Sequence, residues 1–180
     1  MSLEELWQLF PIFLTEHKAC WKEWYAEEAS SLKKALPEMT GISHIGSTSV
    51  PEIWAKPIID ILAEVSAEAD LSEYRKRIEG CGYIFMGESS HGFSFNKGYT
   101  ETGFAEKVFH LHLRHAGDNR ELYFRDYLID HPETAREYEE MKLSLWKKYE
   151  HNRDAYTNAK TEFIKRYTET AMKLYAGRYS

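Results

Sequence analysis

A hydroxyl-rich turn and one aspartate stand out in the segment His44–Asp60, because both fall at the ends of two expected strands. Gly46 allows the backbone to turn sharply after an apolar run and to approach a ligand closely. Ser47, Thr48 and Ser49 follow it directly. Their hydroxyls and successive backbone N–H groups are suited to hold a phosphate group. The segment therefore predicts a phosphate-binding turn.

Asp60 lies within the apolar run Ile58–Leu62, where an unpartnered carboxylate is costly to bury. It could hold Mg²⁺ against a bound phosphate, because Mg²⁺ takes one or two carboxylates together with phosphate oxygens and water. Lys56 is near enough in sequence to neutralise more of the phosphate charge. The structural alternative is that Ser47 or Thr48 caps a short helix while Asp60 caps or bridges a strand end.

Two histidines and an arginine alternate in the sequence HLHLRH, so His110, His112 and Arg114 share one face of the expected strand Lys107–His115. The histidines could bind a transition metal with Asp60 as a third ligand. They could also act as acid or base, or contact phosphate when protonated. A polar strand face satisfied by its neighbours is the structural alternative, and a ligand pocket without a metal is the interpretation we favour.

Single cations also occur in the expected C-terminal helices. Arg125 lies among aromatic residues, and a buried arginine needs a partner. Lys160 is a second single cation of this kind, and Asp126 and Asp130 are possible partners for the two. The charged run Arg136–Lys142 is interpreted as a solvated helix face.

The elements that position these residues follow from hydrophobic periodicity and from proline and glycine. The order predicts a single domain over residues 1–180, of class α/β (α+β), with one mixed sheet and a helical C-terminal third. Asn96–Gly103 is expected to be a mobile surface loop. The expected regions are N-terminal helices in 1–37 broken at Pro11, a sheet core in 39–115 with one helix at 70–82, and helices in 118–175 broken at Pro132.

The 180 residues carry a formal net charge of −6, which argues against broad nucleic-acid binding but permits one small anionic ligand. Only two cysteines occur, Cys20 and Cys81, as expected for a reducing cytosol. The apolar stretch Leu6–Leu14 is too short for a membrane span and lacks the basic start of a signal peptide. The sequence thus predicts a cytoplasmic protein without a membrane partner.

The segment HIGSTSVPEIWAKPIIDI resembles the signature of the GrpB family, a group of small bacterial proteins with a nucleotidyltransferase-like fold. The segments HLHLR, YFRDYLIDHPETAREYEEMK and YTNAKTEFI resemble further blocks of that family in the same order. The resemblance covers Trp21 to Ala171 and places Arg125 and Lys160 at charged positions of those blocks. It implies that both are candidates to reach into a cleft and contact a phosphate or a carboxylate. It implies a mixed sheet flanked by helices.

The resemblance also implies a site, which this chain matches in part. Gly46 and Ser47 match the Gly-Ser turn, and Asp60 matches the first carboxylate of the Asp-hydrophobic-Asp/Glu pattern. Leu62 stands where the second acid is expected, and Glu64 lies two positions further along the same strand face. Because two-metal transfer needs paired carboxylates, the resemblance favours nucleotide binding more than nucleotidyl transfer.

Three functional hypotheses follow, and the sequence leaves open whether the protein is an enzyme. The first is a nucleotidyltransferase-like protein that binds a nucleotide or other phosphorylated small molecule with Mg²⁺ and transfers a nucleotidyl or phosphoryl group to an acceptor hydroxyl, with His110 or His112 as acid or base. The second is a non-catalytic module for a nucleotide or a CoA compound, because domains similar to this family are fused to some bacterial dephospho-CoA kinases. The third is a metal-dependent hydrolase that uses His110, His112 and Asp60.

Overall fold

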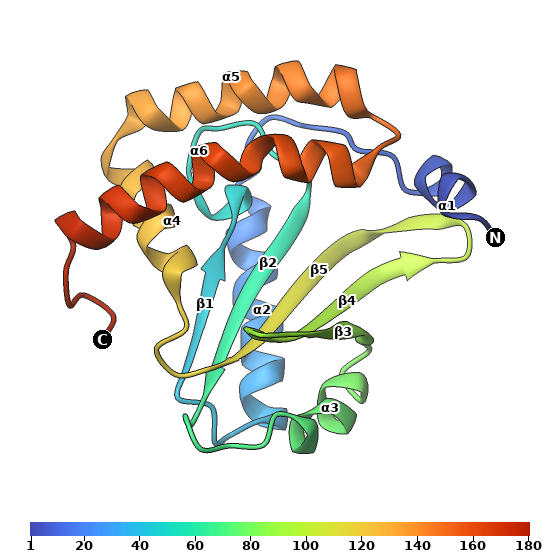
Figure 1. The fold of residues 1–180 in the computed structure, drawn as a ribbon. Helices are drawn as coiled ribbons and strands as arrows, with labels where there is room; N and C mark the ends of the chain where they lie inside the picture. The colour runs from blue at the N-terminus through green and yellow to red at the C-terminus, as the bar shows by residue number, and fades with distance from the viewer.

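The computed structural model describes residues 1–180, which form a five-stranded mixed sheet with helices on both faces (Figure 1). This architecture confirms the predicted fold class. The strands are β1 (Gly41–Ile45), β2 (Ile58–Val65), β3 (Ile84–Ser89), β4 (Gly92–Thr100) and β5 (Gly103–His115). The helices are α1 (Leu3–Leu9), α2 (Cys20–Ala35), α3 (Ser72–Glu79), α4 (Arg120–Asp130), α5 (Pro132–Tyr149) and α6 (Arg153–Leu174), with a short 3-10 helix at Ser47–Ser49.

The strand order is β1-β2-β5-β4-β3, and only the β2–β5 pair is parallel. Asp60 in β2 is in register with His110 in β5. Successive side chains of a strand point to opposite faces, so both residues lie on the face opposite to Ile59 and Ile61. The central strands therefore present their polar residues to one side of the sheet and their core residues to the other.

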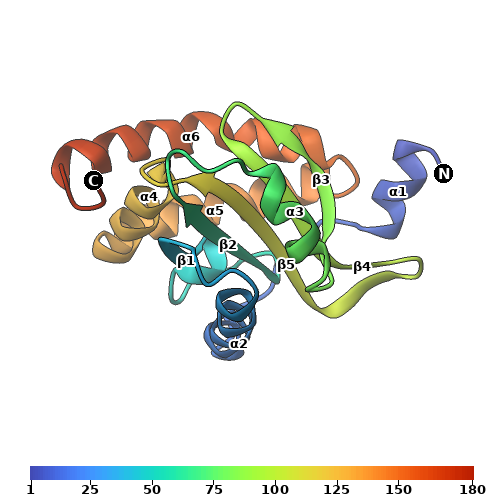
Figure 2. The ribbon, with the colours of Figure 1, turned by 90° about the horizontal axis from the view of Figure 1, so that it is seen from below.

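Helices of different parts of the chain cover the two faces (Figure 2). The face with Ile59 and Ile61 packs in the main hydrophobic core with residues of α2 and α3, among them Trp21, Leu32 and Ile78, all fully buried. Helices α4, α5 and α6 lie on the opposite side of the sheet (Figure 1). None of the helices combines the length and apolarity that crossing a membrane requires.

The predicted surface loop at 96–103 is wrong, because these residues continue the hairpin of β4 and β5. Tyr99 pairs with Phe104, and Thr100 pairs with Gly103 across a tight turn. The rings of Tyr99 and Phe104 each lie 5.0 Å from the ring of Phe10 in the N-terminal segment. Aromatic packing against a segment distant in sequence outweighs the local preference of glycine and threonine for a loop.

The segment between α1 and α2 is extended and is hydrogen-bonded to the loop that precedes β2. Backbone hydrogen bonds of 2.9 and 3.0 Å join Thr15 and Ala55 in both directions. The N–H of Ile12 donates to the carbonyl of Glu150 at the end of α5, at 3.0 Å. These bonds fix the backbone immediately before Lys56.

Candidate functional site

Gly46 brings the end of β1 directly against Asp60. Its φ of 74° lies in the region that favours glycine. Ile45 pairs with Asp60 across β1 and β2, so residue 46 follows immediately beside the carboxylate. A Cβ atom at residue 46 would lie 2.5 Å from Oδ2 of Asp60, well inside van der Waals contact. Both the backbone angle and the close approach therefore require glycine here.

We expect Gly46→Ala to lower the free energy of unfolding by about 1–3 kcal/mol, because alanine would be strained at this φ and would displace Asp60. Urea denaturation measures this change. Gly80→Ala is the matched control, since Gly80 has a φ of −63° that alanine adopts readily. Equal losses in the two variants would contradict the close packing at Gly46.

Asp60 lies beside two histidines of β5. Nδ1 of His110 and Nε2 of His112 are each 3.5 Å from Oδ1 of Asp60. Burial alone would raise the pKa of Asp60, but its contacts with the two histidines outweigh this and hold the pKa below its usual range. Burial also lowers the pKa of His110. At neutral pH the site therefore contains an ionised Asp60 beside a neutral His110.

His110 ends a polar chain that begins on α6. Nη1 of Arg153 donates to Oη of Tyr99 at 3.0 Å, and the same oxygen lies 2.7 Å from Nε2 of His110. Arginine can only donate, so the Tyr99 proton is free to bond Nε2, and the His110 ring proton then sits on Nδ1, facing Asp60. Both ring nitrogens are engaged, so a ligand reaches His110 as acid or base only by displacing Tyr99.

A cavity of about 270 Å³ adjoins Asp60 between the Gly46 turn and helices α5 and α6. We call it the cation cavity, because four basic side chains line it: Lys56, Lys142, Arg153 and Lys160. Asp60 is the single carboxylate in its wall. The excess of positive over negative charge makes this cavity complementary to a polyanion.

The cavity lysines titrate far below their usual range. Burial, followed by the neighbouring charges of Lys160 and Arg153, lowers the pKa of Lys56 to about 7. Burial lowers the pKa of Lys160 to about 8, although Asp60 opposes this. Burial and then the nearby lysines also hold the pKa of Lys142 well below its usual value. A bound anion would restore the charge of these groups.

Lys142 is a candidate site residue that the sequence did not indicate. Its side chain is buried, and Nζ donates to the carbonyl of Trp54 at 2.7 Å and to Oγ of Ser47 at 2.9 Å. Glu139, in the preceding turn of α5, accepts the N–H of Trp54 at 2.7 Å. Helix α5 thus holds both backbone polar groups of Trp54. The interpretation of Arg136–Lys142 as a solvated face is therefore wrong for Lys142.

The hydroxyls of the turn are placed differently from one another. Ser47 and Thr48 line the cation cavity, whereas Ser49 does not. Oγ1 of Thr48 donates to the carbonyl of Ile58 at 3.0 Å, and Oγ of Ser49 donates to the carbonyl of Gly46. The structure therefore brings Ser47 and Thr48 to Asp60 but uses the Thr48 and Ser49 hydroxyls to hold the turn itself.

Arg114 is paired outside the cation cavity. Its Nη1 lies 2.6 Å from Oε1 of Glu121 and 3.4 Å from Oδ1 of Asp118, both beyond the end of β5. The arginine is on the same strand face as His110 and His112, as the alternation predicts. Its side chain is mostly buried and joins β5 to the start of α4.

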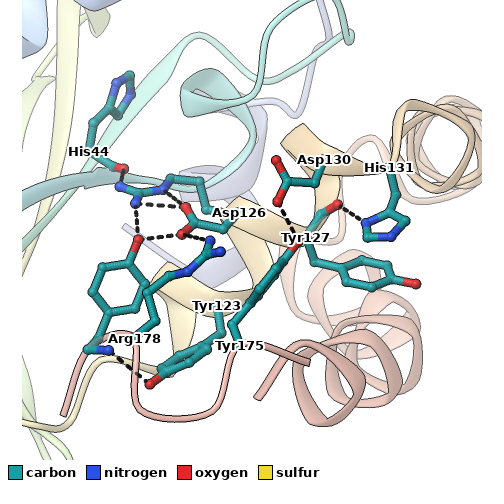
Figure 3. A network of polar contacts seen from close by, with 10 residues as sticks. His44, Tyr123, Asp126, Tyr127, Asp130, His131, Tyr175 and Arg178 are labelled. Atoms are coloured by element: carbon teal, nitrogen blue, oxygen red, sulfur yellow. Dashed lines mark hydrogen bonds and ion pairs between the residues drawn. The ribbon is translucent and has the colours of Figure 1, made fainter. Parts of the chain in front are cut away.

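Arg125 likewise lies away from the cavity wall, in a network with the C-terminal segment. Its Nε donates to Asp126 at 2.9 Å, Nη1 donates to the carbonyl of His44 at 3.1 Å, and Nη2 donates to Oη of Tyr179 at 3.0 Å. Figure 3 shows this network, in which Asp126 also pairs with Arg178. Arg125 therefore ties α4 and the last residues to β1, two positions before the Gly46 turn.

No second carboxylate faces Asp60 from the position where the fold pattern places one. Leu62 is fully buried and packs with Ile45 and Leu122. Glu64 accepts hydrogen bonds of 3.1 Å from the backbone N–H of Gly117 and from Nδ2 of Asn119. Asp60 is thus the one acid that the cavity offers to a metal ion.

No group of three or more His, Cys, Asp or Glu side chains is placed to hold a metal ion. The transition-metal site at His110, His112 and Asp60 stays a prediction. Elemental analysis of protein purified without a metal-affinity tag tests it. Stoichiometric zinc, manganese, nickel or iron would support the hydrolase hypothesis, and their absence would count heavily against it.

Comparison with known proteins gives relatives over most of the chain. Residues 11–170 match the GrpB protein family. YqkA of Bacillus subtilis (strain 168) is 36% identical over 162 residues, which cover 88% of this chain and 46% of YqkA. The chain thus spans about half the length of that relative.

Solved structures agree with the match to the GrpB protein family. The crystal structure of GrpB from Enterococcus faecalis has a TM-score of 0.78 and 33% identity, and the match covers 91% of this chain and 99% of that one. Cid1, described as an RNA terminal uridylyl transferase, has a TM-score of 0.54 at 11% identity over 82% of this chain and 46% of its own, a likeness of fold alone. The chain belongs to the GrpB family and has a nucleotidyltransferase-like fold.

Proposed function

We propose that this protein binds a nucleotide or other phosphorylated small molecule together with Mg²⁺ in the cation cavity. The observation that carries the proposal is the convergence of four basic side chains around one ionised carboxylate, Asp60. None of these four side chains has a carboxylate within salt-bridge distance, so a bound anion would supply the missing negative charge.

The residues of the cavity suit a magnesium–phosphate ligand. Asp60 would hold the metal ion, whose remaining positions are suited to phosphate oxygens and water. Lys56, Lys160 and Arg153 would bind the other phosphate oxygens, and the hydroxyl of Ser47 would donate to one of them. Magnesium would neutralise and orient the phosphates.

Two candidate functions differ in whether the bound nucleotide reacts, namely transfer of a nucleotidyl or phosphoryl group and binding without reaction. The packing of the strand that carries Asp60 favours binding without reaction. Leu62 packs in the apolar core, and the Glu64 carboxylate accepts hydrogen bonds away from the cavity. Both ring nitrogens of His110 are already in contact with Tyr99 and Asp60. A transferase would need to stabilise the attacking and leaving oxygens with a single carboxylate-held ion. Nucleotidyl transfer from a nucleoside triphosphate to an acceptor hydroxyl releases pyrophosphate, and phosphoryl transfer releases the nucleoside diphosphate. Release of either product distinguishes a transferase from a binding module, which releases neither.

Thermal-shift titration with nucleotides and CoA compounds, each with and without Mg²⁺, tests the proposed function. A ligand that binds only the folded state raises Tm with concentration. We expect at least one compound to do so, and to do so more strongly with Mg²⁺. Lys160→Met should remove the shift. Lys165→Met is the matched control, because Lys165 is exposed on the same helix and does not line the cavity. A shift in Lys160→Met as large as that of the wild type at the same ligand concentration would contradict the assignment of the cavity.

A further inference from the structure

A second cavity of about 170 Å³ adjoins the cation cavity, and Lys56, Ile58 and Arg153 line both. We call it the aromatic pocket, because four of its lining residues are aromatic: Phe13, Trp21, Trp24 and Phe104. The lining of the aromatic pocket is therefore more apolar than that of the cation cavity, although the two cavities share one wall. A ligand that spans them would have an anionic part and a planar or apolar part.

The aromatic pocket is held by contacts between distant segments. Ile12, which precedes Phe13 in sequence, donates its N–H to the carbonyl of Glu150. Thr15, two residues after Phe13, is joined to Ala55 by two backbone hydrogen bonds. The ring of Phe104 lies 6.3 Å from that of Phe13 in an edge-to-face arrangement. The pocket walls are thus fixed by hydrogen bonds and ring packing rather than by one exposed loop.

The walls also carry buried donors without acceptors. Trp21 is fully buried, and its indole N–H has no hydrogen-bond partner within the protein. Nε and Nη2 of Arg153 are likewise buried and unpartnered. Most buried polar groups in proteins are hydrogen-bonded, so these donors point to a ligand that supplies acceptors.

We propose that the aromatic pocket takes the heteroaromatic base of a nucleotide whose phosphates occupy the cation cavity. This inference rests on the proposed function and narrows its ligand from phosphorylated compounds in general to nucleotides. A base has π faces to pack on Trp24 and Phe13, and ring nitrogens or carbonyls to accept hydrogen bonds from Trp21. Arg153 and Lys56, which line both cavities, lie where the base meets the phosphates.

Isothermal titration calorimetry with Mg²⁺ complexes of tripolyphosphate, ATP, GTP, CTP and UTP separates the two parts of the ligand. We expect at least one nucleoside triphosphate to bind about tenfold more tightly than tripolyphosphate. Trp24→Leu and Phe13→Ala should remove that advantage and leave the affinity for tripolyphosphate unchanged. Phe13 is 37% exposed, so its truncation should not prevent folding. Ile84→Ala, a 53% exposed position in the edge strand β3, is the control.

The outcomes distinguish this inference from the proposed function. Tripolyphosphate that binds as tightly as every nucleoside triphosphate would overturn the base pocket and leave the phosphate site intact. An advantage that survives in both Trp24→Leu and Phe13→Ala would overturn it as well. If neither tripolyphosphate nor any nucleotide binds, the proposed function itself fails.

Discussion

Lys160→Met is expected to weaken binding of magnesium tripolyphosphate about 100-fold and, in the same variant, to stabilise the ligand-free protein. The first effect follows from the loss of a cation that lines a cavity with one carboxylate. The second follows because Lys160 is held charged in a buried site among other cations. Function and stability should therefore change in opposite directions.

The sign of the stability effect comes from the pKa. Burial lowers the pKa of Lys160 to about 8 from its ordinary value of 10.5, so the unfolded chain binds this proton more tightly than the folded protein. The penalty is fully present below about pH 8 and disappears as the pH rises toward 10.5. Methionine removes it but also loses the contact of Nζ with the Tyr156 ring, 4.5 Å from its centroid.

We therefore expect Lys160→Met to raise the free energy of unfolding at pH 7 by about 1–2 kcal/mol, and by less at pH 10. Urea denaturation at the two pH values measures both. Lys165→Met, which removes an exposed cation from the same helix, should change neither stability nor binding. A Lys160→Met variant that is less stable than wild type at pH 7 would show that other groups of the ligand-free protein already compensate the charge of Lys160.

Asp60→Asn is expected to remove the Mg²⁺-dependent part of ligand affinity, a loss of about 100-fold for magnesium tripolyphosphate. Asparagine keeps the shape of the side chain but lacks the charge that attracts the metal ion. Binding of metal-free tripolyphosphate should be unchanged or tighter, because the variant removes the one negative charge in the cavity wall. This opposite response separates loss of the metal ion from loss of fold.

The same variant should cost about 2 kcal/mol of stability at pH 7, because the contacts of the ionised carboxylate with His110 and His112 are lost. The contacts with His110 and His112 outweigh burial and lower the pKa of Asp60, so its stabilising effect is present above the unfolded-state value near 3.8 and fades as the pH falls. The difference between wild type and variant should accordingly shrink in acid. Asp154→Asn, at an exposed position in the first turn of α6, is the control. Mg²⁺-dependent binding retained in Asp60→Asn would place the metal ion elsewhere.

The central strands and the Gly46 turn were predictable because their signals are local. An Ile-rich run marks a strand buried on both faces, and Asp60 stands out within it because a buried carboxylate is rare. The placement of Lys160 in the cavity followed from the family resemblance rather than from spacing, since a single lysine in a helix has no local signal.

The rest of the site depends on contacts between residues far apart in sequence. Lys142 contacts Ser47, 95 residues away in sequence, and Arg153 contacts Tyr99, 54 residues away. In a helical run of charged residues, a buried lysine has the same local pattern as a solvated one. The neighbouring glycines predict a loop at Tyr99, whereas its pairing with Phe104 and its packing against the ring of Phe10 hold it in a hairpin.

Proton uptake during binding of tripolyphosphate tests the central claim, that the lysine-lined cavity beside Asp60 holds a polyphosphate. The titration is made by calorimetry at pH 8 with excess Mg²⁺, in two buffers of different ionisation enthalpy. Burial and neighbouring cations lower the pKa of Lys56 to about 7, and burial lowers that of Lys160 to about 8, so a polyanion bound beside them must draw protons from the buffer. The account predicts binding with a net uptake of about one proton. Binding without proton uptake, or no binding at all, would contradict it.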